Sequence, residues 1–399
     1  MSEEKLVPKL RFSGFDDEWN QYYLKDVIQD FINGQTPSRN VDSFWNGDVN
    51  WVSSGELNYN YITSTIEQIT AEGKNNTNLK LLSPGTFLIA ITGLEAPGTR
   101  GSCAILGIEA TTNQSCMALL PKEDKIITKF LYYWYLKVGE TYGIKYTQGT
   151  KQQSYNKELL EKLPITIPDI REQNKISEFL SVLNHKIELL EQKYQYYQEF
   201  KKYLMQQIFT QKLRFNFNDT WKTVKIKDIF DERSEKGFLD LELLSVTLND
   251  GVIKRSEIES KDNSNENKSN YKHVLPGDIV YNSMRMWQGA SGVSPYEGIV
   301  SPAYTILIPK NVYSKYFGYY FKTNEMVYQF KKYSQGLTSD TWNLKYPLIS
   351  EIKIKIPSIE EQKEITNVFE IMDEKIKILQ NNIDELTTFK KGLLQQMFV

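Results

Sequence analysis

Few residues of this chain have the type and spacing that a catalytic or metal centre needs. Its cysteines and histidines match no zinc-ligand spacing. They are Cys103, Cys116, His185 and His273. Glu351 and Lys353 have the Glu-x-Lys spacing of nucleases, but so short a motif also arises by chance. The sequence has no Walker A pattern, no Gly-rich phosphate loop and no Asn/Asp-Pro-Pro-aromatic motif of adenine methyltransferases. We therefore predict no catalytic centre and no metal site in this chain.

Polar side chains that can read base pairs are concentrated in two loops, residues 145–154 and 331–340. Arg and Lys pair with guanine edges, Asn and Gln with adenine, and Ser and Thr with either. Gly149 and Gly336 allow each loop a tight turn or a close backbone approach. The candidate DNA-binding residues here are Lys145, Thr150, Lys151, Gln152, Gln153, Lys331, Lys332, Thr338 and Ser339. A second group of candidates is Arg39, Ser53, Ser54, Arg285 and Gln288. The alternative for each loop is an ordinary polar turn.

The net charge of the chain limits the ways in which it could bind nucleic acid. Its formal net charge is −2 and its pI is about 6.0, whereas free-standing, non-specific binders are usually basic. Residues 310–345 nevertheless hold six lysines against Glu325 and Asp340, a local excess that suits phosphates. A solvated surface explains any one of these lysines equally well. This composition is compatible with phosphate contacts that are local or shared with a partner.

The two loops occupy matching places in an internal repeat. KLPITIPDIREQ, which begins at Lys162, aligns with EIKIKIPSIEEQ, which begins at Glu351, so the two copies are 189 residues apart (351 − 162). FKKYLMQQIF (200–209) aligns without a gap with FKKGLLQQMF (389–398). KLRFSGFDDEW (9–19) resembles KLRFNFNDTW (212–221). A duplicated structural domain is the alternative, but the long variable segments differ far more than the helical ones.

Each half joins a mixed domain to one long helix, which predicts an α+β fold. Segments 86–91 and 279–281 follow a Pro-Gly pair and predict strands. Segments 129–138 and 315–322 are aromatic-rich and predict helices. With 399 residues, of which 40% are hydrophobic, the chain is long enough for more than one domain core.

The two helical segments carry a heptad pattern of apolar residues, spaced alternately by four and three. The predicted coiled-coil seam comprises Ile176, Leu180, Leu183, Ile187, Leu190, Ile365, Phe369, Met372, Ile376 and Leu379. Lys201 and Lys390 interrupt the two seams at the same place, where a polar residue fixes the register at some cost in stability. The alternative is a pair of core helices within two globular domains.

The starts of both helices are marked by capping boxes, Asp169 with Glu172 and Ser358 with Glu361. About 40 helical residues at 1.5 Å each span roughly 60 Å. If the helices pair antiparallel, the two domains attach at opposite ends. Major-groove faces one turn apart lie about 34–36 Å apart, so such a pair can act as a ruler between two DNA-reading domains.

The repeat also continues across the ends of the chain. After Phe209 the chain runs directly into a KLRF segment, whereas after Phe398 only Val399 follows, and the matching KLRF stands at residues 9–12. We therefore predict a circular, pseudo-twofold organisation. Residues 1–19 close the circle, 20–160 form the first domain, 161–215 the first long helix, 216–350 the second domain and 351–399 the second long helix.

Two such domains, with divergent loops and nearly identical helices, resemble the specificity subunits of type I restriction–modification systems. The resemblance covers essentially the whole chain. Its most specific parts are the Ile-Pro-x-x-x-Glu-Gln helix entries at 167–173 and 356–362 and the Gln-Gln-x-Phe helix ends. GQTPSR (34–39), followed by WVSSGEL (51–57), is similar to the start of many target recognition domains, and the second domain lacks this pattern. The fold implied is two repeated α/β target recognition domains separated by an antiparallel coiled coil.

The resemblance implies a non-catalytic subunit that reads a bipartite sequence in double-stranded DNA. Two modification (methyltransferase) subunits and two restriction (ATP-dependent translocase and nuclease) subunits are its implied partners, for adenine methylation or restriction. No cofactor is expected on this chain, and S-adenosylmethionine, ATP and Mg²⁺ are implied for the partners. The few cysteines and the absence of a signal peptide or an apolar run of about 20 residues indicate a cytoplasmic protein without membrane contact. The alternative function is an assembly scaffold with two protein-binding domains on a coiled coil and no DNA contact.

Overall fold

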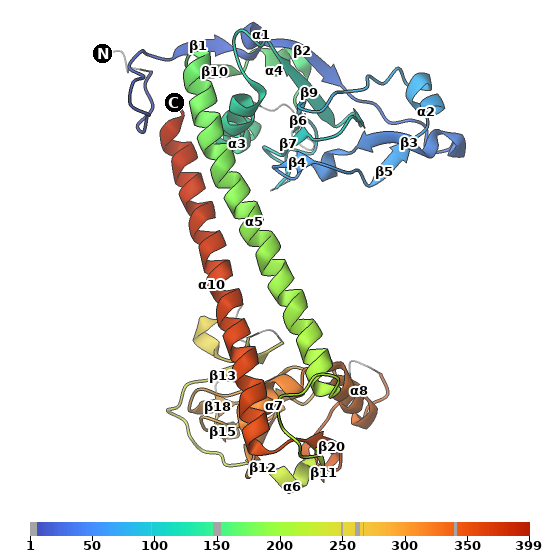
Figure 1. Cartoon of the computed structure of the whole chain (residues 1–399), viewed down its shortest axis with the longest axis vertical. Helices are drawn as coiled ribbons and strands as arrows, with labels where there is room; N and C mark the ends of the chain where they lie inside the picture. Colours follow the sequence, from blue (N-terminus) through green and yellow to red (C-terminus); the bar gives the residue numbers. More distant parts are fainter. Residues whose placement is uncertain are drawn as a thin grey trace. The chain divides into compact units, whose positions relative to one another are not determined.

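The computed structural model describes residues 6–96, 98–146, 153–248, 250–259, 264–265, 267–338 and 341–399. The chain divides into two compact units. The first unit is Met1–Glu191 with Asn381–Val399, and the second unit is Gln192–Gln380. Each unit therefore combines one mixed domain with the adjoining part of both long helices (Figure 1). The predicted α+β fold is confirmed.

The first unit is built on a five-stranded sheet of order β2-β9-β6-β7-β4. Its strands are β2 (Ile28–Asn33), β4 (Tyr61–Ile62), β6 (Phe87–Ala90), β7 (Cys103–Leu106) and β9 (Cys116–Pro121). The strand predicted at 86–91 is confirmed by β6, which is buried at every position because the sheet is covered by helix α3 (Thr128–Lys145). A second, three-stranded sheet has the order β5-β3-β8. It consists of β3 (Trp45–Val52), β5 (Glu67–Ile69) and β8 (Thr111–Thr112).

The only cysteines of the chain lie on two strands of the five-stranded sheet, on either side of β6. Cys103 begins β7 and Cys116 begins β9, and both are unoxidised and fully buried. Burial disfavours the thiolate and raises the pKa of both thiols. Both side chains therefore act as small apolar core residues.

The second unit has a four-stranded sheet of order β12-β19-β16-β17, which corresponds to strands β2, β9, β6 and β7 of the five-stranded sheet in the first unit. The four strands are β12 (Phe230–Glu232), β16 (Ile279–Asn282), β17 (Ser291–Val293) and β19 (Tyr304–Pro309). Two strand pairs complete the domain, β13 (Leu244–Thr247) with β14 (Gly251–Lys254) and β15 (Lys272–Val274) with β18 (Gly298–Val300). The strand predicted at 279–281 is confirmed. The helix predicted at 315–322 is observed as α7 (Ser314–Tyr320), and α8 (Asn324–Tyr333) follows it after an N-cap at Thr323.

In each unit a short antiparallel strand pair ties the start of the domain to the start of a long helix. In the first unit β1 (Asn20–Tyr23) pairs with β10 (Pro164–Ile167), and in the second β11 (Lys222–Lys225) pairs with β20 (Lys353–Ile356). The remaining short helices are α1 (Leu24–Val27), α2 (Ala71–Asn76), α4 (Lys157–Glu161), α6 (Ile226–Ile229) and α9 (Tyr346–Ile349).

The long helices are α5 (Ile170–Phe209) and α10 (Ile359–Met397). Of the ten predicted seam residues, Leu190 and Ile376 are half-buried and the others are buried. Lys390 donates to the Oδ1 of Asn184 in the first unit, and Lys201 pairs with Asp373 in the second. Within each unit, the parts of the two helices that belong to it therefore pair antiparallel.

The helix entries make more contacts than their capping boxes. Asp169 Oδ1 accepts from the backbone N–H of Glu172 at 2.8 Å, and Ser358 Oγ accepts from that of Glu361 at 3.3 Å, as capping residues do. The glutamates, however, turn to arginines of the KLRF segments. Arg11 donates twice to Glu172, both at 2.8 Å, and Arg214 donates twice to Glu361 at 3.1 and 2.7 Å.

The adjacent glutamines of the entry motif hold the domain to the helix. Gln173 Oε1 accepts from the backbone N–H of Ile127 at 3.0 Å, and Gln362 Oε1 accepts from that of Tyr313 at 2.9 Å. Both glutamines are buried, so these bonds are shielded from water. The Glu-Gln pair of each entry therefore binds the KLRF segment on one side and the segment before α3 or α7 on the other.

The N-terminal segment makes the contact that the connection after α5 makes in the second unit. The backbone N–H of Leu10 donates to the carbonyl of Gln396 at 2.9 Å, and that of Leu213 donates to the carbonyl of Gln207 at 3.1 Å. Gln396 and Gln207 are equivalent positions of the repeat. The N-terminal segment therefore closes the first unit as the connection after α5 closes the second, as the circular repeat predicted.

Candidate nucleic-acid interface

In the first unit Arg39 lies on an aromatic surface formed by β3. Its guanidinium stands 3.7 Å from the ring centroid of Trp45 and 5.3 Å from that of Trp51. It also donates twice to the carboxylate of Glu67 on β5, once at 2.8 Å. These hydrogen bonds raise the pKa of Arg39 and lower the pKa of Glu67. The arginine is 53% exposed and the glutamate 38%, so the pair is held in place yet open to solvent.

The sequence GQTPSR reaches this position because two indoles hold its backbone. The indole N–H of Trp51 donates to the carbonyl of Gln35 at 3.0 Å, and that of Trp45 donates to the carbonyl of Ser38 at 3.1 Å. Gly34, at the start of the segment, lies so close to Thr112 that a Cβ would stand 2.2 Å from a carbonyl oxygen, which only glycine permits. The segment therefore runs along β3 and carries Arg39 over Trp45.

Ser53 and Ser54 follow β3 in a short 3₁₀ turn and belong to the same surface. The hydroxyl and the backbone N–H of Ser53 both donate to Glu56 at 2.8 Å. The other carboxylate oxygen of Glu56 accepts from the N–H of Ile66, next to Glu67. The Ser53 hydroxyl is thus engaged in a local cap, whereas Ser54 is half-buried as the first residue of the turn.

Lys145 and Gln153 lie in a different part of the first unit. Lys145 is exposed at the end of α3, with its ammonium 5.1 Å from the ring of Tyr146. The backbone N–H of Gln153 donates to the carboxylate of Glu95 at 3.0 Å, and its carbonyl accepts from Leu94. Three further candidates of this loop, Thr150, Lys151 and Gln152, fall outside the described residues.

In the second unit the candidates gather around two tryptophans. Trp287 meets Trp342 edge to face at 5.3 Å, and the Lys331 ammonium lies 5.5 Å from the Trp342 ring. Arg285 and Gln288 flank Trp287 in a 3₁₀ turn that packs against α8, the helix whose last turn carries Lys331 and Lys332. Arg285, Gln288, Lys331 and Lys332 are all exposed.

A hairpin-like bridge presents the loop after α8. Gln335 and Asn343 exchange two backbone hydrogen bonds, at 3.0 and 2.8 Å, so the loop between them is closed at its base. Thr338 is exposed in this loop, and its backbone N–H donates to the Thr341 hydroxyl at 3.2 Å. Ser339 falls outside the described residues.

Each domain therefore presents cations beside indole rings, next to short polar turns. Cations suit phosphates and guanine edges, and half-buried rings such as those of Trp45, Trp287 and Trp342 can still offer part of their surface to sugars and base methyl groups. The sequence reading missed Trp45 and Glu67, which form the site around Arg39. No alternation in the sequence signals Trp45, because an irregularity in β3 between Trp45 and Val49 breaks the alternation and brings its ring to 5.2 Å from that of Trp51.

Glu351 of the Glu-x-Lys spacing is engaged by two lysines of β11 and α6. Lys225 and Lys227 each bind one of its carboxylate oxygens at 2.6 Å. Their hydrogen bonds lower the pKa of Glu351 to about 2. Across the described ranges, His, Cys, Asp and Glu side chains form no group of three or more that could hold a metal ion. Within the same ranges, no helix is both long and apolar enough to cross a bilayer.

A scan against family models matches both halves of the chain. The model described as the type I restriction modification DNA specificity domain matches residues 16–196 and 218–388. Curated relatives include the MjaIX specificity subunit of Methanocaldococcus jannaschii, 29% identical over 43% of this chain, and the EcoR124I/EcoR124II specificity subunit of Escherichia coli, 28% identical over 48%. The chain spans 39% and 49% of the length of these two relatives. The MjaVIII specificity subunit of M. jannaschii is 22% identical over 95% of this chain and 91% of its own length.

Two solved structures share the fold. The S subunit of a type I restriction–modification system from M. genitalium matches with a TM-score of 0.62 and 16% identity, over 98% of this chain and 99% of that one. A chain from a structure of the assembly and conformational transition of the type I restriction–modification system matches with a TM-score of 0.58 and 14% identity, over 97% and 99%. At these identities the likeness concerns the fold. Because the family model covers most of both halves, this chain belongs to the family of type I restriction–modification DNA specificity proteins.

Proposed function

We propose that the chain is a specificity subunit that reads a bipartite sequence in double-stranded DNA and directs adenine methylation or restriction by partner subunits. The observation that carries the proposal is the duplication itself. Two units share one scaffold down to matching helix-entry ion pairs, and each presents a different set of cations and indoles. A scaffold that is repeated in both units, with polar surfaces that differ between them, is what two independent reading domains require.

The partners proposed are two modification subunits, joined by two restriction subunits. Each unit exposes the same three apolar positions of the long helices, which supports two equivalent partners. In the first unit they are Val182 (72% exposed), Leu189 (51%) and Phe389 (55%). In the second unit the equivalent residues are Ile371 (45%), Ile378 (50%) and Phe200 (39%). A second apolar stripe on a helix that already buries its seam is a surface for further helices.

In this proposal the chain is non-catalytic and acts in the cytoplasm, where its DNA target lies. S-adenosylmethionine, ATP and Mg²⁺ belong to the partner subunits, and this chain contributes surfaces rather than reacting groups. Poor behaviour of the isolated chain is expected, because the exposed stripes lack their partners.

Co-expression with the modification partner, followed by mapping of N6-methyladenine across genomic DNA, tests the function. The expected result is methylation at one bipartite sequence with a fixed gap between its halves. A complex that assembles but methylates no defined sequence would contradict DNA reading and would favour a scaffold. A stable monomer that binds one DNA sequence without partners would contradict the assembly part of the proposal.

A further inference from the structure

The exposed apolar side chains of the two long helices all lie on one flank. Helices α5 and α10 are described from end to end, and their seam residues occupy heptad positions a and d, with Leu180 at a and Leu183 at d. Every large apolar side chain that is exposed on either helix stands at position c or g, and these positions are adjacent on the helix surface. The residues are Phe179, Val182, Leu189, Tyr196, Phe200, Tyr203, Ile371, Ile378 and Phe389.

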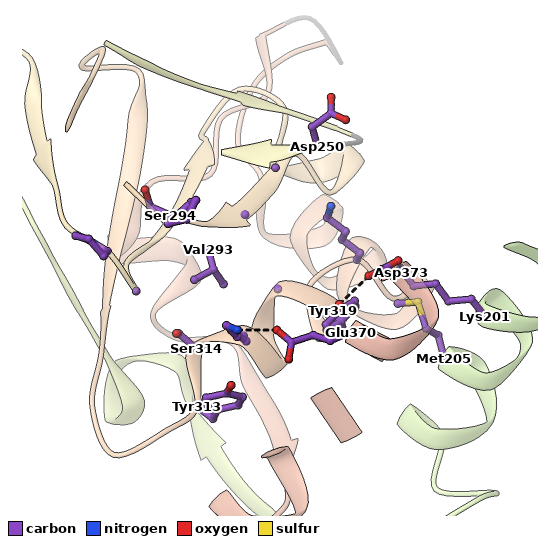
Figure 2. A pocket seen from close by; sticks show the side chains of 18 residues that line it. Lys201, Met205, Asp250, Val293, Ser294, Tyr313, Ser314, Tyr319, Glu370 and Asp373 are labelled. Carbon is purple, nitrogen blue, oxygen red and sulfur yellow. Dashed lines mark hydrogen bonds and ion pairs between the residues drawn. The ribbon is translucent and has the colours of Figure 1, made fainter. Parts of the chain in front are cut away.

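The opposite flank of the helices holds the domains. In the second unit Lys315 donates to Glu370, at position b, at 2.7 Å. Figure 2 shows Glu370 and Asp373, at position e, directed towards the domain beside a pocket of about 740 Å³ that they line. In the first unit the hydroxyl of Tyr133 donates to Ser181, also at b, at 3.2 Å. The c and g positions therefore face away from the domain of their own unit.

Within each unit the two helices contribute to a single apolar strip. In an antiparallel pair the g positions of the two helices adjoin across the seam, so the c and g residues of both helices lie on the same side. Strip 1, in the first unit, comprises Phe179, Val182, Leu189 and Phe389. Strip 2, in the second unit, comprises Tyr196, Phe200, Tyr203, Ile371 and Ile378.

The two strips match in position but differ in composition. Strip 2 holds Tyr196 (61% exposed) and Tyr203 (54%), and the equivalent positions of the first unit are Glu385 and Gly392. The ring of Tyr196 stacks on that of Phe200, with centroids 6.0 Å apart and planes 8° from parallel. Where strip 2 presents three neighbouring rings, the first unit therefore has one phenylalanine between a carboxylate and a glycine.

One position favours strip 1. Phe179 stands where the second unit has Val368, but its ring packs edge to face on Phe12 of the KLRF segment, with centroids 5.6 Å apart. Only 38% of Phe179 is therefore exposed. The other c and g positions are either polar in both units or apolar in both. The pairs that are apolar in both are Val182 with Ile371, Leu189 with Ile378 and Phe389 with Phe200. The two tyrosines are thus the main difference between the strips.

A strip that occurs twice in one chain fits two copies of one partner, because each copy can use the same patch of its own surface. This step rests on the proposed function, in which that partner is the modification subunit. The tyrosines stand three and four residues from Phe200, which belongs to the repeated set, so a subunit that covers Phe200 also covers them. Tyr is enriched among the residues that dominate binding energy, whereas Glu is depleted at interfaces.

We propose that the two partner sites are unequal, and that the first modification subunit to bind occupies strip 2. Tyr196 and Tyr203 add aromatic area to that site when it is covered. The first unit instead offers Glu385, whose carboxylate must lose water on binding, and Gly392, which has no side chain. When the modification subunit is limiting, complexes with one subunit therefore form before complexes with two.

Dilution of the purified complex of one chain with two modification subunits, followed by mass photometry, tests the proposal. A complex with one subunit should accumulate over a range of concentrations. The reason is that the two dissociation constants should differ by about tenfold or more beyond the statistical factor. The measurement contains no DNA, so its result is separate from that of the methylation experiment.

Two double variants exchange the character of the strips. Tyr196→Glu with Tyr203→Ala should weaken the tighter site by about tenfold or more and so remove the intermediate. Alanine is used because glycine would weaken the helix. Glu385→Tyr with Gly392→Tyr should strengthen the weaker site, and a Cβ at Gly392 meets nothing within 4 Å. Gln198→Ala is the matched control, because Gln198 is exposed at position e of the same helix as the tyrosines.

Dissociation constants that differ only by the statistical factor in the wild type would overturn the proposal. So would an intermediate that persists unchanged in the first double variant. Two chains held together by strip 2 would also overturn it, because the tyrosines would then serve self-association. A wild-type chain that binds no modification subunit would refute the proposed assembly together with this inference. Thermal melting shows that each variant is folded.

Discussion

Glu172 in the first unit and Glu361 in the second begin equivalent helices, and each binds an arginine of a KLRF segment. The surfaces that these helices support share almost nothing. One unit places Arg39 between Glu67 and Trp45, and the other places lysines beside Trp342. The contacts near the long helices are therefore the same in both units and fix how each domain is held, whereas the outer strands and turns differ between the units.

Exchange of a whole domain is expected to have the largest effect. Replacing residues 20–160 by the corresponding domain of a relative should change one half of the bipartite target completely and leave the other half and the gap unchanged. The reason is that the Arg11–Glu172 ion pair lies outside the exchanged segment, and Gln173 binds the domain through a backbone N–H, that of Ile127, which a domain of the same fold also supplies. Methylome mapping of the chimaera gives the result, and a change in both halves would refute independent reading.

The entry ion pairs should be equally important in both units. Glu172→Ala leaves the Arg11 guanidinium without its buried partner, and Glu361→Ala does the same to Arg214. Each substitution should lower the stability of its helix entry by a similar amount, because a doubly hydrogen-bonded pair with a buried carboxylate is lost. Hydrogen exchange at the start of α5 and of α10 measures each loss locally. A large loss in one unit with none in the other would show that the frames are not equivalent.

Reading residues should act on one half-site each. Arg39→Ala should reduce discrimination at the half-site of the first domain, and Lys331→Ala at that of the second, each by about 1–3 kcal/mol if the residue contacts a base edge. The measurement compares binding of the assembled complex to targets altered in one half. An equal loss for every sequence would instead identify a phosphate contact.

The tryptophans that follow the KLRF segments differ in one hydrogen bond. The indole N–H of Trp221 donates to Glu361 at 3.3 Å, whereas that of Trp19 is buried without a partner among the described residues. Trp221→Phe should therefore cost about 1–3 kcal/mol more than Trp19→Phe, because the loss of ring area cancels between them. Chemical denaturation of the two variants tests the difference, and equal costs would remove the role assigned to this bond.

The smallest change in stability is expected when the two lysines within the coiled-coil seams are replaced. The change should have opposite signs at Lys201 and Lys390. Lys201 pairs with a carboxylate, whereas Lys390 meets the neutral amide of Asn184. Burial lowers the pKa of Lys390 below its usual 10.5, so its charged form opposes folding at neutral pH and this penalty fades as the pH rises towards 10.5. Lys390→Met should stabilise the fold by about 1 kcal/mol at pH 7, and Lys201→Met should destabilise it.

The pH dependence provides the control for this last pair. The advantage of Lys390→Met over the wild type should shrink between neutral pH and pH 10.5, because the wild-type lysine loses its charge there. Thermal melting across this range makes the measurement. A constant advantage would show that packing, and not charge, determines the effect.

The long helices and the strands and turns that are common to both units could be predicted, because their sequence patterns are periodic or repeated. The heptads of α5 and α10, the Pro-Gly turns before β6 and β16 and the recurrence of KLRF each appear twice in the sequence. The Glu-Gln entries were recognised as motifs, but their contacts were not, because Arg11 and Glu172 meet only after the chain has folded. The ion pair of Arg39 with Glu67 likewise joins the turn before β3 to β5, and no local pattern specifies that contact. The role of the helices as a ruler stays a prediction.

The burial of Cys103 and Cys116 has a practical consequence. A thiol reacts as its thiolate, and both thiols are enclosed by the sheet and held protonated. These are the only cysteines in the sequence, so the native surface offers no competing nucleophilic sulfur. A single cysteine introduced at Gln288, or at Arg39, would therefore be the one position that a maleimide dye modifies. Fluorescence from that dye would report on each half of the molecule separately as DNA is added.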